Sequence, residues 1–259
     1  MKRLSVATLL FLVSGCTALQ GKLVWRVRDV ALAPTPTISF LGRDEETAFK
    51  MNTQTVQKLL LAHLRITRSA GVQAELVITE GDEPNAFAGM MNERRVVGIN
   101  TGMIKMIGDD IDEYAALLGH ETAHWAKGHV DAGKMRSNTI QVIGAALGAG
   151  LGAAGIPGAG YITGFGADLV EASYSRGDER EADALSVDYM LANGFDPAGA
   201  LRLQEKVRKL PAGAPIPFLS SHPSNEERIE NLKRLIAAKR AEQKRDEGPS
   251  ENVIFDQPR

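Results

Sequence analysis

Apolar residues recur every three or four positions along much of the chain, which is the spacing that one buried face of an α-helix produces. This pattern predicts helices over the ranges 45–70, 110–129, 173–193, 196–210 and 224–245. Strand-like alternation over 72–78 and 95–99 predicts a small sheet of about three strands packed on these helices. The fold class predicted from the pattern is therefore α+β and mostly helical.

Turn-forming and capping residues support several of these boundaries. Gly71 and Gly194 follow the last apolar positions of two predicted helices, as helix stop signals do. Pro197 suits the first turn of the helix that follows it, because proline removes no helical hydrogen bond there. Ser224, with Glu227 three residues later, predicts a capping box at the start of the last helix.

Two proline-containing stretches fit neither a helix nor a regular strand. Pro34 and Pro36 interrupt the alternation over 20–43, which predicts an extended arm. The stretch over 211–218 is rich in proline and predicts a loop.

The stretch over 140–170 is dense in glycine and alanine, with Pro157 near its middle. Its apolar content suggests a membrane span, but repeated glycines and the proline interrupt the run before the roughly 20 residues that a bilayer requires. Two close-packed helices joined by a flexible turn, or a mobile flap over a cleft, fit this composition better. Contact with a membrane surface remains an alternative.

The start of the chain has the pattern of a secretory signal. Basic residues precede an apolar run over 4–13, and small residues follow it. The sequence Val-Ser-Gly-Cys at 13–16 resembles the bacterial lipobox, where cleavage precedes a cysteine that is then acylated. We therefore expect a signal peptide over 1–15 and a lipid anchor on Cys16, the alternative being an ordinary secretory signal with an incidental cysteine.

Beyond the signal, we expect a lipidated arm over 16–43, a folded domain over 44–245 and a disordered polar tail over 246–259. The acyl chains would hold the protein on the membrane without spanning it. Thr17, in place of the aspartate that retains lipoproteins at the inner membrane, favours the outer membrane. The expected location is thus the inner leaflet of the outer membrane, in a bacterial periplasm.

Composition and charge exclude several classes of partner and site. The formal net charge is −2, and it becomes −4 (28 basic against 32 acidic residues) once Lys2 and Arg3 leave with the signal. Such a mild charge, without a basic stripe, excludes nucleic acid as a partner. Cys16 is the single cysteine, so neither an intramolecular disulfide nor a thiolate zinc cluster can form. A metal would have to be bound by histidine and carboxylate groups.

The helix predicted over 110–129 carries His-Glu-Thr-Ala-His at 120–124. Residues four apart lie on one face of a helix, so His120 and His124 can hold one ion. Glu121 lies next to that face, where it can act as a general base. Two ligands and a base at this spacing are typical of zinc peptidases, and the alternative is a chance match on an amphipathic helix.

A catalytic zinc site needs a third protein ligand and one open position. The charged segment over 174–183 offers carboxylates for this purpose. Glu179 and Asp183 are four apart and can both face the histidines, one as a ligand and the other as the acceptor that orients a histidine ring. On spacing alone Glu181 or Asp178 could be the ligand instead, and a solvated, charged helix face is the alternative.

Together these segments resemble metallopeptidase family forty-eight, the CAAX prenyl protease and HtpX family of gluzincins. The motifs that carry the resemblance are His120-Glu121-x-x-His124, Ser175-Arg176-x-x-Glu179-x-Glu181-Ala182-Asp183, Ser221-His222-Pro223-Ser224, Asn85-Ala86-Phe87-Ala88 and Thr101-Gly102. They occur in the family's order and extend from about residue 78 to residue 235.

The resemblance implies a mostly helical gluzincin peptidase domain whose small β-sheet lies beside the metal-binding helix. It implies one Zn²⁺ per chain, with Glu179 as the third ligand, Asp183 as the partner that orients a histidine, and Glu121 as the catalytic base. Because the chain lacks the family's transmembrane helices and carries a lipobox, it resembles the periplasmic lipoprotein branch. The implied activity is a zinc metalloendopeptidase that hydrolyses misfolded or misassembled envelope proteins.

Asn85, Ala86, Phe87 and Ala88 form the segment that the resemblance places at an edge strand beside the zinc helix. An extended substrate could add itself to this edge through backbone hydrogen bonds, a mode that tolerates many side chains. This mode suits the unfolded or misassembled envelope proteins that we expect as partners. The alternative is a plain edge strand.

The remaining polar candidates each have more than one interpretation. His222 could be an oxyanion donor, a ligand at the open position of zinc that keeps the enzyme latent, or a surface histidine near a helix start. His129 lies off the ligand face, five residues beyond His124, so we expect it to pack at a helix end. His63 is expected to be exposed, and Arg176 to pair with a carboxylate or remain solvated.

The alternative function belongs to another class of protein. It is a latent or inactive zinc-binding, chaperone-like factor for outer-membrane proteins. Glu121 favours the peptidase, because a pure binding protein needs no base. A structural zinc site is disfavoured, because such sites are usually closed by four Cys or His ligands, and His222 would have to supply the fourth.

Overall fold

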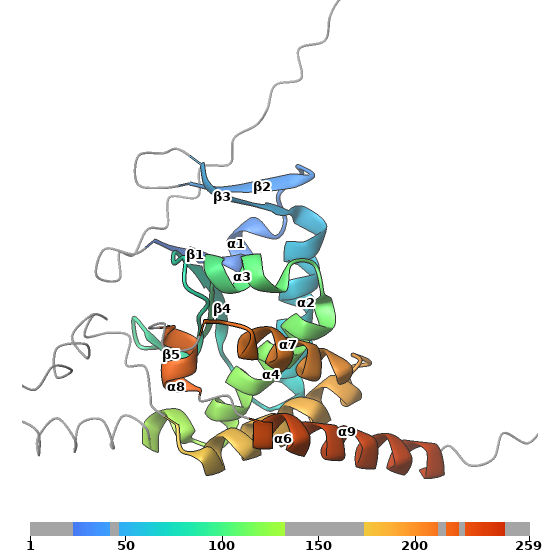
Figure 1. Ribbon diagram of the computed structural model, residues 1–259. Helices are drawn as coiled ribbons and strands as arrows, with labels where there is room; N and C mark the ends of the chain where they lie inside the picture. Colours follow the sequence, from blue (N-terminus) through green and yellow to red (C-terminus); the bar gives the residue numbers. More distant parts are fainter. Residues whose placement is uncertain (1–22, 42–46, 133–173, 212–215, 223–225, 247–259) are drawn as a thin grey trace, which may run out of the picture.

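The computed structural model describes residues 23–41, 47–132, 174–211, 216–222 and 226–246 (Figure 1). The strands are β1 (Val24–Arg26), β2 (Thr37–Leu41), β3 (Thr47–Asn52), β4 (Glu75–Thr79), β5 (Ala86–Met91) and β6 (Arg94–Asn100). The helices are α1 (Val27–Val30), α2 (Thr53–Ser69), α3 (Thr101–Ile107), α4 (Ile111–Ala126), α6 (Arg176–Ala192), α7 (Ala198–Arg208), α8 (Pro217–Ser221) and α9 (Glu226–Asp246). The predicted α+β, mostly helical class is confirmed. None of the helices described has the length and apolar character of a membrane span.

The larger sheet has the strand order β1-β4-β6-β5. Its central strands, β4 and β6, run parallel, and β1 and β5 are antiparallel to their neighbours at the two edges. The strands predicted over 72–78 and 95–99 are β4 and β6. The sheet has four strands rather than the three expected, because β1 joins it from the N-terminal side.

The β5–β6 hairpin fixes the edge of this sheet. Asn92 and Glu93 form its two-residue turn with φ angles of 47° and 61°, the conformation whose twist matches that of the flanking strands. Phe87 pairs with Gly98 across the hairpin, and a Cβ on Gly98 would lie 2.1 Å from the ring of Phe87. Glycine is therefore required at position 98 for the aromatic ring to cover the neighbouring strand.

Residues 23–41 belong to the folded domain, which corrects the extended arm predicted over 20–43. β1 is a strand of the main sheet, and the side chains of Leu23, Trp25 and Val27 are buried in the core. The two prolines that suggested an arm lie in the connection between α1 and β2. They separate two elements of the domain and do not mark its boundary.

The helix predicted over 45–70 begins only at Thr53, because residues 47–52 form β3. This strand pairs with β2 in a separate two-stranded sheet, which lies at the end of the molecule opposite α6 and α9 (Figure 1). Asn52 ends the strand and caps α2, its side chain accepting a hydrogen bond from the backbone N–H of Gln54 at 2.8 Å. Apolar residues in this short strand also fit a helical period, so the pattern alone misplaced the boundary.

α4, which carries the His-Glu-Thr-Ala-His motif, lies at the centre of the fold (Figure 1). Every residue from Glu113 to Trp125 is buried, and the helix packs against α2, α6, α7 and β5. Trp125 ties its C-terminal end to the sheet by donating Nε1–H to the carbonyl oxygen of Val96 at 3.0 Å. The predicted metal-bearing helix is thus also the core of the structure.

The N-terminal end of α4 is held by Asp110 and α7. The Asp110 carboxylate caps the helix by accepting from the backbone N–H groups of Asp112 and Glu113, both at 3.1 Å. Arg202 of α7 donates Nε–H and Nη2–H to the same carboxylate at 2.8 and 2.9 Å. This paired contact lowers the pKa of Asp110 and fixes α7 against the start of α4.

α4 and α6 approach closely where Gly119 faces Ser186. Ser186 donates Oγ–H to the carbonyl oxygen of Ala116 at 2.8 Å. A Cβ on Gly119 would lie 2.7 Å from that Oγ and 3.2 Å from the Cα of Ser186. The absence of a side chain at position 119 therefore sets the separation of the two helices.

Several predictions fall on residues that the structure does not describe: the signal peptide over 1–15, Cys16, the segment over 140–170, Ser224 of the capping box, and the tail after Asp246. The proline-rich loop predicted over 211–218 ends in a short helix, since α8 begins at Pro217.

We expect Gly119→Ala to lower the free energy of unfolding by about 1–3 kcal/mol, because the added methyl must push Ser186 and α6 away from α4. Gly177→Ala is the matched control, because a Cβ there would have Ser175 Oγ at an ordinary 3.5 Å. That change adds a methyl to α6 and should be neutral or stabilising by up to about 1 kcal/mol. Urea unfolding measures the free energy of unfolding of both variants. If Gly119→Ala were as stable as Gly177→Ala, the close approach of α4 and α6 would not require glycine at position 119.

Candidate metal centre

Four buried side chains converge on one point inside the molecule. His120 and His124 come from α4, Glu179 from the first turn of α6, and His222 from the residue that follows α8. One ligand atom from each lies within 4.8 Å of the other three. Imidazole nitrogens and a carboxylate oxygen are donors that suit a divalent transition metal, so this cluster is a candidate metal centre.

Asp183 orients the ring of His120. Nδ1 of His120 lies 3.0 Å from Oδ1 of Asp183, and its Nε2 lies 3.1 Å from Nε2 of His124. A carboxylate can only accept, so Nδ1 carries the proton, and in the neutral ring Nε2 presents its lone pair to the cluster. This carboxylate–histidine pair is the arrangement that metal-binding histidines require.

A second chain of hydrogen bonds orients His124. Nδ1 of His124 lies 3.0 Å from Nδ1 of His129, and Nε2 of His129 lies 3.1 Å from Oε2 of Glu181. Glu181 accepts from His129 Nε2–H, which leaves His129 Nδ1 to accept from His124 Nδ1–H. The Nε2 atom of His124 is then also unprotonated toward the cluster. His129 packs at the helix end as expected, but its hydrogen bond to a candidate ligand was not predicted.

Two opposite effects set the pKa values of the buried histidines: burial lowers them, and nearby carboxylates raise them. Burial lowers the pKa of His120, but Glu179 and Asp183 outweigh it and raise that pKa to about 9. Burial dominates at His124, whose pKa lies well below its ordinary value. The cluster therefore attracts a proton when no other cation occupies it, and a metal ion would compete with that proton.

The formal charge of the region fits a divalent cation. The buried charged groups are three carboxylates and one guanidinium: Glu121, Glu179, Asp183 and Arg228. With neutral imidazoles these groups sum to −2, which an ion of charge +2 would neutralise. Burial opposes ionisation of Glu179, but the neighbouring His120 and His222 outweigh burial and lower its pKa.

Glu121 lies beside the cluster with its carboxylate fully buried. Neither oxygen has a hydrogen-bond partner among the described residues, and Nε2 of His222 approaches Oε1 only to 3.4 Å. Burial raises the pKa of this carboxyl group. Buried polar groups without partners are rare and destabilising, so Glu121 is better explained by chemistry than by folding.

Arg228 of α9 is the main residue that the sequence prediction missed. It is only 5% exposed, and its Nε and Nη2 donate to Asp183 at 2.6 and 2.8 Å. Its Nη1 lies 2.5 Å from Oε2 of Glu179. The charged run from Glu226 to Lys233 contains no local signal that separates this arginine from a solvated helix face.

Aromatic rings enclose the cluster. The ring of Tyr174 stacks on His124 with centroids 3.6 Å apart and planes 14° apart. The ring of Phe218 stacks on His222 at 4.8 Å and 27°. His222 is fully buried and places Nδ1 2.9 Å from Oε1 of Glu179, so the interpretation as a surface histidine is wrong.

The structure distinguishes the carboxylates that spacing left open. Glu179 enters the cluster, and Asp183 lies behind one of the histidines. Asp178 instead forms the capping box at the start of α6, and the side chain of Glu181 is 45% exposed at the edge of the site. Arg176 is exposed at the first position of α6, which agrees with the solvated alternative.

His63 lies outside the cluster and is buried, which corrects the exposed position expected for it. Its Nε2–H donates to the carbonyl oxygen of Ala74 at 2.9 Å and so connects α2 to the residue before β4. Burial lowers the pKa of its ring. Its role is therefore structural.

The predicted substrate segment lies at an edge of the main sheet. Ala86, Phe87 and Ala88 are on β5, and Asn85 immediately precedes it. In the described part of the chain β5 pairs with a strand only on the β6 side, and α4 packs against it. The four side chains are buried, so the outer edge offers its backbone groups rather than side chains.

The model of peptidase family M48 matches residues 51–236, a range that contains α4, α6 and His222. This chain belongs to peptidase family M48. The family resemblance predicted from the sequence motifs is confirmed.

Metalloprotease LoiP of Escherichia coli K12 is 32% identical over 157 residues, which cover 60% of this chain and 59% of LoiP. Metalloprotease YcaL of the same organism is 30% identical over 142 residues, 55% of each protein. A protease HtpX homolog of Acidovorax ebreus is 32% identical over 205 residues, 66% of this chain and 69% of that protein. The chain thus spans less than two thirds of the length of LoiP and YcaL.

We expect His129→Leu to weaken the binding of a divalent metal, tested with added Zn²⁺, about 10–100-fold, because the Nδ1–H of His124 loses its acceptor and the ring loses its fixed orientation. Lys127→Met is the matched control, because it removes the surface ion pair of Lys127 with Glu181 (2.6 Å) and leaves both histidines in place. Competition with a zinc-binding dye measures all three affinities. Equal affinities would rule out an orienting role for His129.

Proposed function

We propose that this chain is a zinc-dependent metalloendopeptidase. The central observation is the convergence of His120, His124 and Glu179 beside the carboxylate of Glu121, which has no hydrogen-bond partner among the described residues. Membership of peptidase family M48 and similarity to relatives named metalloproteases support the proposal.

His120, His124 and Glu179 would hold one zinc ion per chain, since two imidazoles and a carboxylate form a common ligand set of catalytic zinc. When bound, zinc supplies Lewis acidity and lowers the pKa of water to near neutrality. Asp183 and His129 keep the two rings in the tautomer that leaves each Nε2 free.

Glu121 would act as the general base and then as the general acid. Its carboxylate takes a proton from the attacking water and passes that proton to the leaving amine of the peptide. A raised pKa suits this role, because the same group must accept and release a proton near neutral pH. Neither oxygen has a hydrogen-bond partner among the described residues, so either can accept this proton.

β5 would bind the substrate. Both backbone groups of Asn85 bond to Asn100, so an extended peptide would pair with the outer edge of β5 within Ala86–Ala88. Backbone pairing makes little demand on the substrate's side chains. Unfolded or misassembled proteins supply such extended segments.

We further propose that the substrates are envelope proteins and that a lipid anchor on Cys16 holds the enzyme at the outer membrane in a bacterial periplasm. The apolar run over 4–13 and the lipobox-like sequence at 13–16 support this location. An enzyme anchored there would meet proteins that fail to assemble in the envelope.

We expect Glu121→Gln to lower kcat on an unfolded protein such as casein by about 10²–10⁴-fold, because the amide cannot accept the proton of water. Bound zinc should remain at one per chain, since Glu121 is not among the proposed ligands. The assay uses the soluble chain from Thr17 with and without a chelator. Cleavage retained by the variant would eliminate Glu121 as the base, and zinc without cleavage in the wild type would favour the chaperone-like alternative.

His222 gives the structure the features of a latent form. Its ring lies between the ligands and the base, with Nδ1 3.2 Å from Nε2 of His120 and Nε2 3.4 Å from Oε1 of Glu121. This is the space that water and the peptide carbonyl need. We propose that the ring must withdraw before a substrate binds.

We expect His222→Ala to raise kcat/KM about tenfold, because a hydrogen bond to a charged group stabilises the closed arrangement by about 1.5 kcal/mol. The measurement is casein cleavage at equal zinc loading, with Ser221→Ala as the neighbouring control. A fall in activity would assign His222 to catalysis instead of latency.

A further inference from the structure

Arg228 occupies an unusual position for a charged residue. It comes from α9, which supplies none of the proposed ligands, yet its side chain reaches the candidate metal centre and is almost fully buried. A buried guanidinium requires carboxylate partners, because removing its charge from water is otherwise strongly unfavourable. Its partners are one proposed ligand, Glu179, and Asp183, which lies behind another.

The guanidinium divides its donors between two carboxylates of α6. Nε and Nη2 form a paired contact with Oδ2 and Oδ1 of Asp183 at 2.6 and 2.8 Å. Nη1 contacts Oε2 of Glu179 at 2.5 Å. The paired contact fixes the rotation of the Asp183 carboxylate as well as its position, and the single ion pair holds Oε2 of Glu179 on the guanidinium.

The two contacts have different consequences for the centre. Oε2 of Glu179 lies on Arg228 and 3.4 Å from Nε2 of His120, whereas Oε1 faces His124 at 3.3 Å and His222 at 2.9 Å. Asp183 uses the same Oδ1 for Nη2 of Arg228 and for Nδ1 of His120. One side chain therefore constrains both a proposed ligand and the group that orients another.

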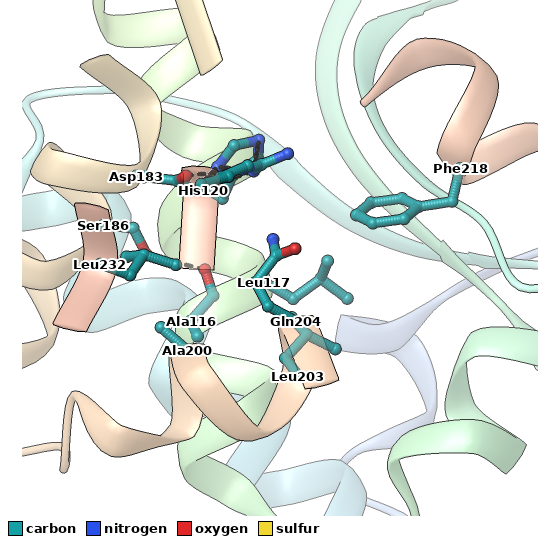
Figure 2. Close-up of a pocket in the computed structure, with 11 residues that line it drawn as sticks. Ala116, Leu117, His120, Asp183, Ser186, Ala200, Leu203, Gln204, Phe218 and Leu232 are labelled. Carbon is teal, nitrogen blue, oxygen red and sulfur yellow. Dashed lines mark hydrogen bonds and ion pairs between the residues drawn. The ribbon is translucent and has the colours of Figure 1, made fainter. Parts of the chain in front are cut away.

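A small cavity lies next to Arg228. Figure 2 shows His120 and Asp183 at one end of this cavity, with Phe218 across from them and Leu117, Leu203 and Leu232 among the residues around it. The space has room for about one water molecule. The ion pairs with Asp183 and Glu179 hold the guanidinium beside this cavity.

We propose that Arg228 is a positioning residue of the metal centre, which presents one oxygen of Glu179 to the ion and locks the Asp183–His120 pair. α9 then supports metal retention without providing a ligand. This inference rests on the proposed function, because it concerns the same ion. A purely structural ion pair would affect the stability of the fold and leave metal affinity unchanged.

The test measures zinc affinity by dye competition and compares Arg228→Lys with Arg202→Met. Arg228→Lys keeps the charge but loses the planar fork, so it cannot serve both carboxylates in the same geometry. We expect it to bind zinc about 10–100-fold more weakly than the wild type. Arg202→Met removes the similarly paired contact with Asp110, remote from the proposed ligands, and should bind zinc as the wild type does.

The possible outcomes distinguish a failure of the positioning role of Arg228 from a failure of the proposed function. Zinc affinity of Arg228→Lys within about threefold of the wild type would overturn the positioning role. A Lys variant that does not fold, judged by far-UV circular dichroism, would also overturn it, because the guanidinium would then serve the fold itself. A wild-type chain that binds no zinc would instead refute the proposed function. Weaker binding by Arg228→Lys, with normal binding by Arg202→Met, supports the inference.

Discussion

The burial of α4 is the constraint on which the rest of the structure depends. A helix that is buried on all sides can carry polar side chains only where its neighbours supply partners or an ion. α4 carries His120, Glu121 and His124 within its buried length, and the partners come from several other elements. α6 contributes Glu179 and Asp183, and α9 contributes the guanidinium that contacts both and offsets part of their charge. The helices around α4 are thus arranged by polar requirements as well as by apolar packing.

The framework that holds α4 is independent of the candidate site. The Asp110–Arg202 contact fixes its first turn, and the hydrogen bond of Trp125 fixes its last turn to the sheet. Between these ends, the contact of Gly119 with Ser186 sets the distance to α6. Because α4 is fixed at both ends and α6 is held against it at Ser186, the relative geometry of the proposed ligands is set without an ion.

Local spacing predicted the parts of the site that lie within one helix. His120 and His124, like Glu179 and Asp183, are pairs four residues apart, and helical geometry places each pair on one face. His222 contacts His120 across 102 positions and Arg228 contacts Asp183 across 45, and no periodicity encodes such contacts. The strand over 47–52 was missed for a different reason, since its few apolar residues fit two periods equally well.

The order of the chain delays assembly of the site until nearly all of the fold has been made. His120 precedes Arg228 by 108 positions, and His222 also lies in the last part of the described chain. During synthesis, which proceeds from the N-terminus, α4 is therefore complete long before the groups that position and close its site have emerged. The proposed ligands on α4 and α6 are therefore made before Arg228 and His222. The complete geometry of the centre, with the residues that position and close it, is thus one of the last features of the fold that the growing chain can form.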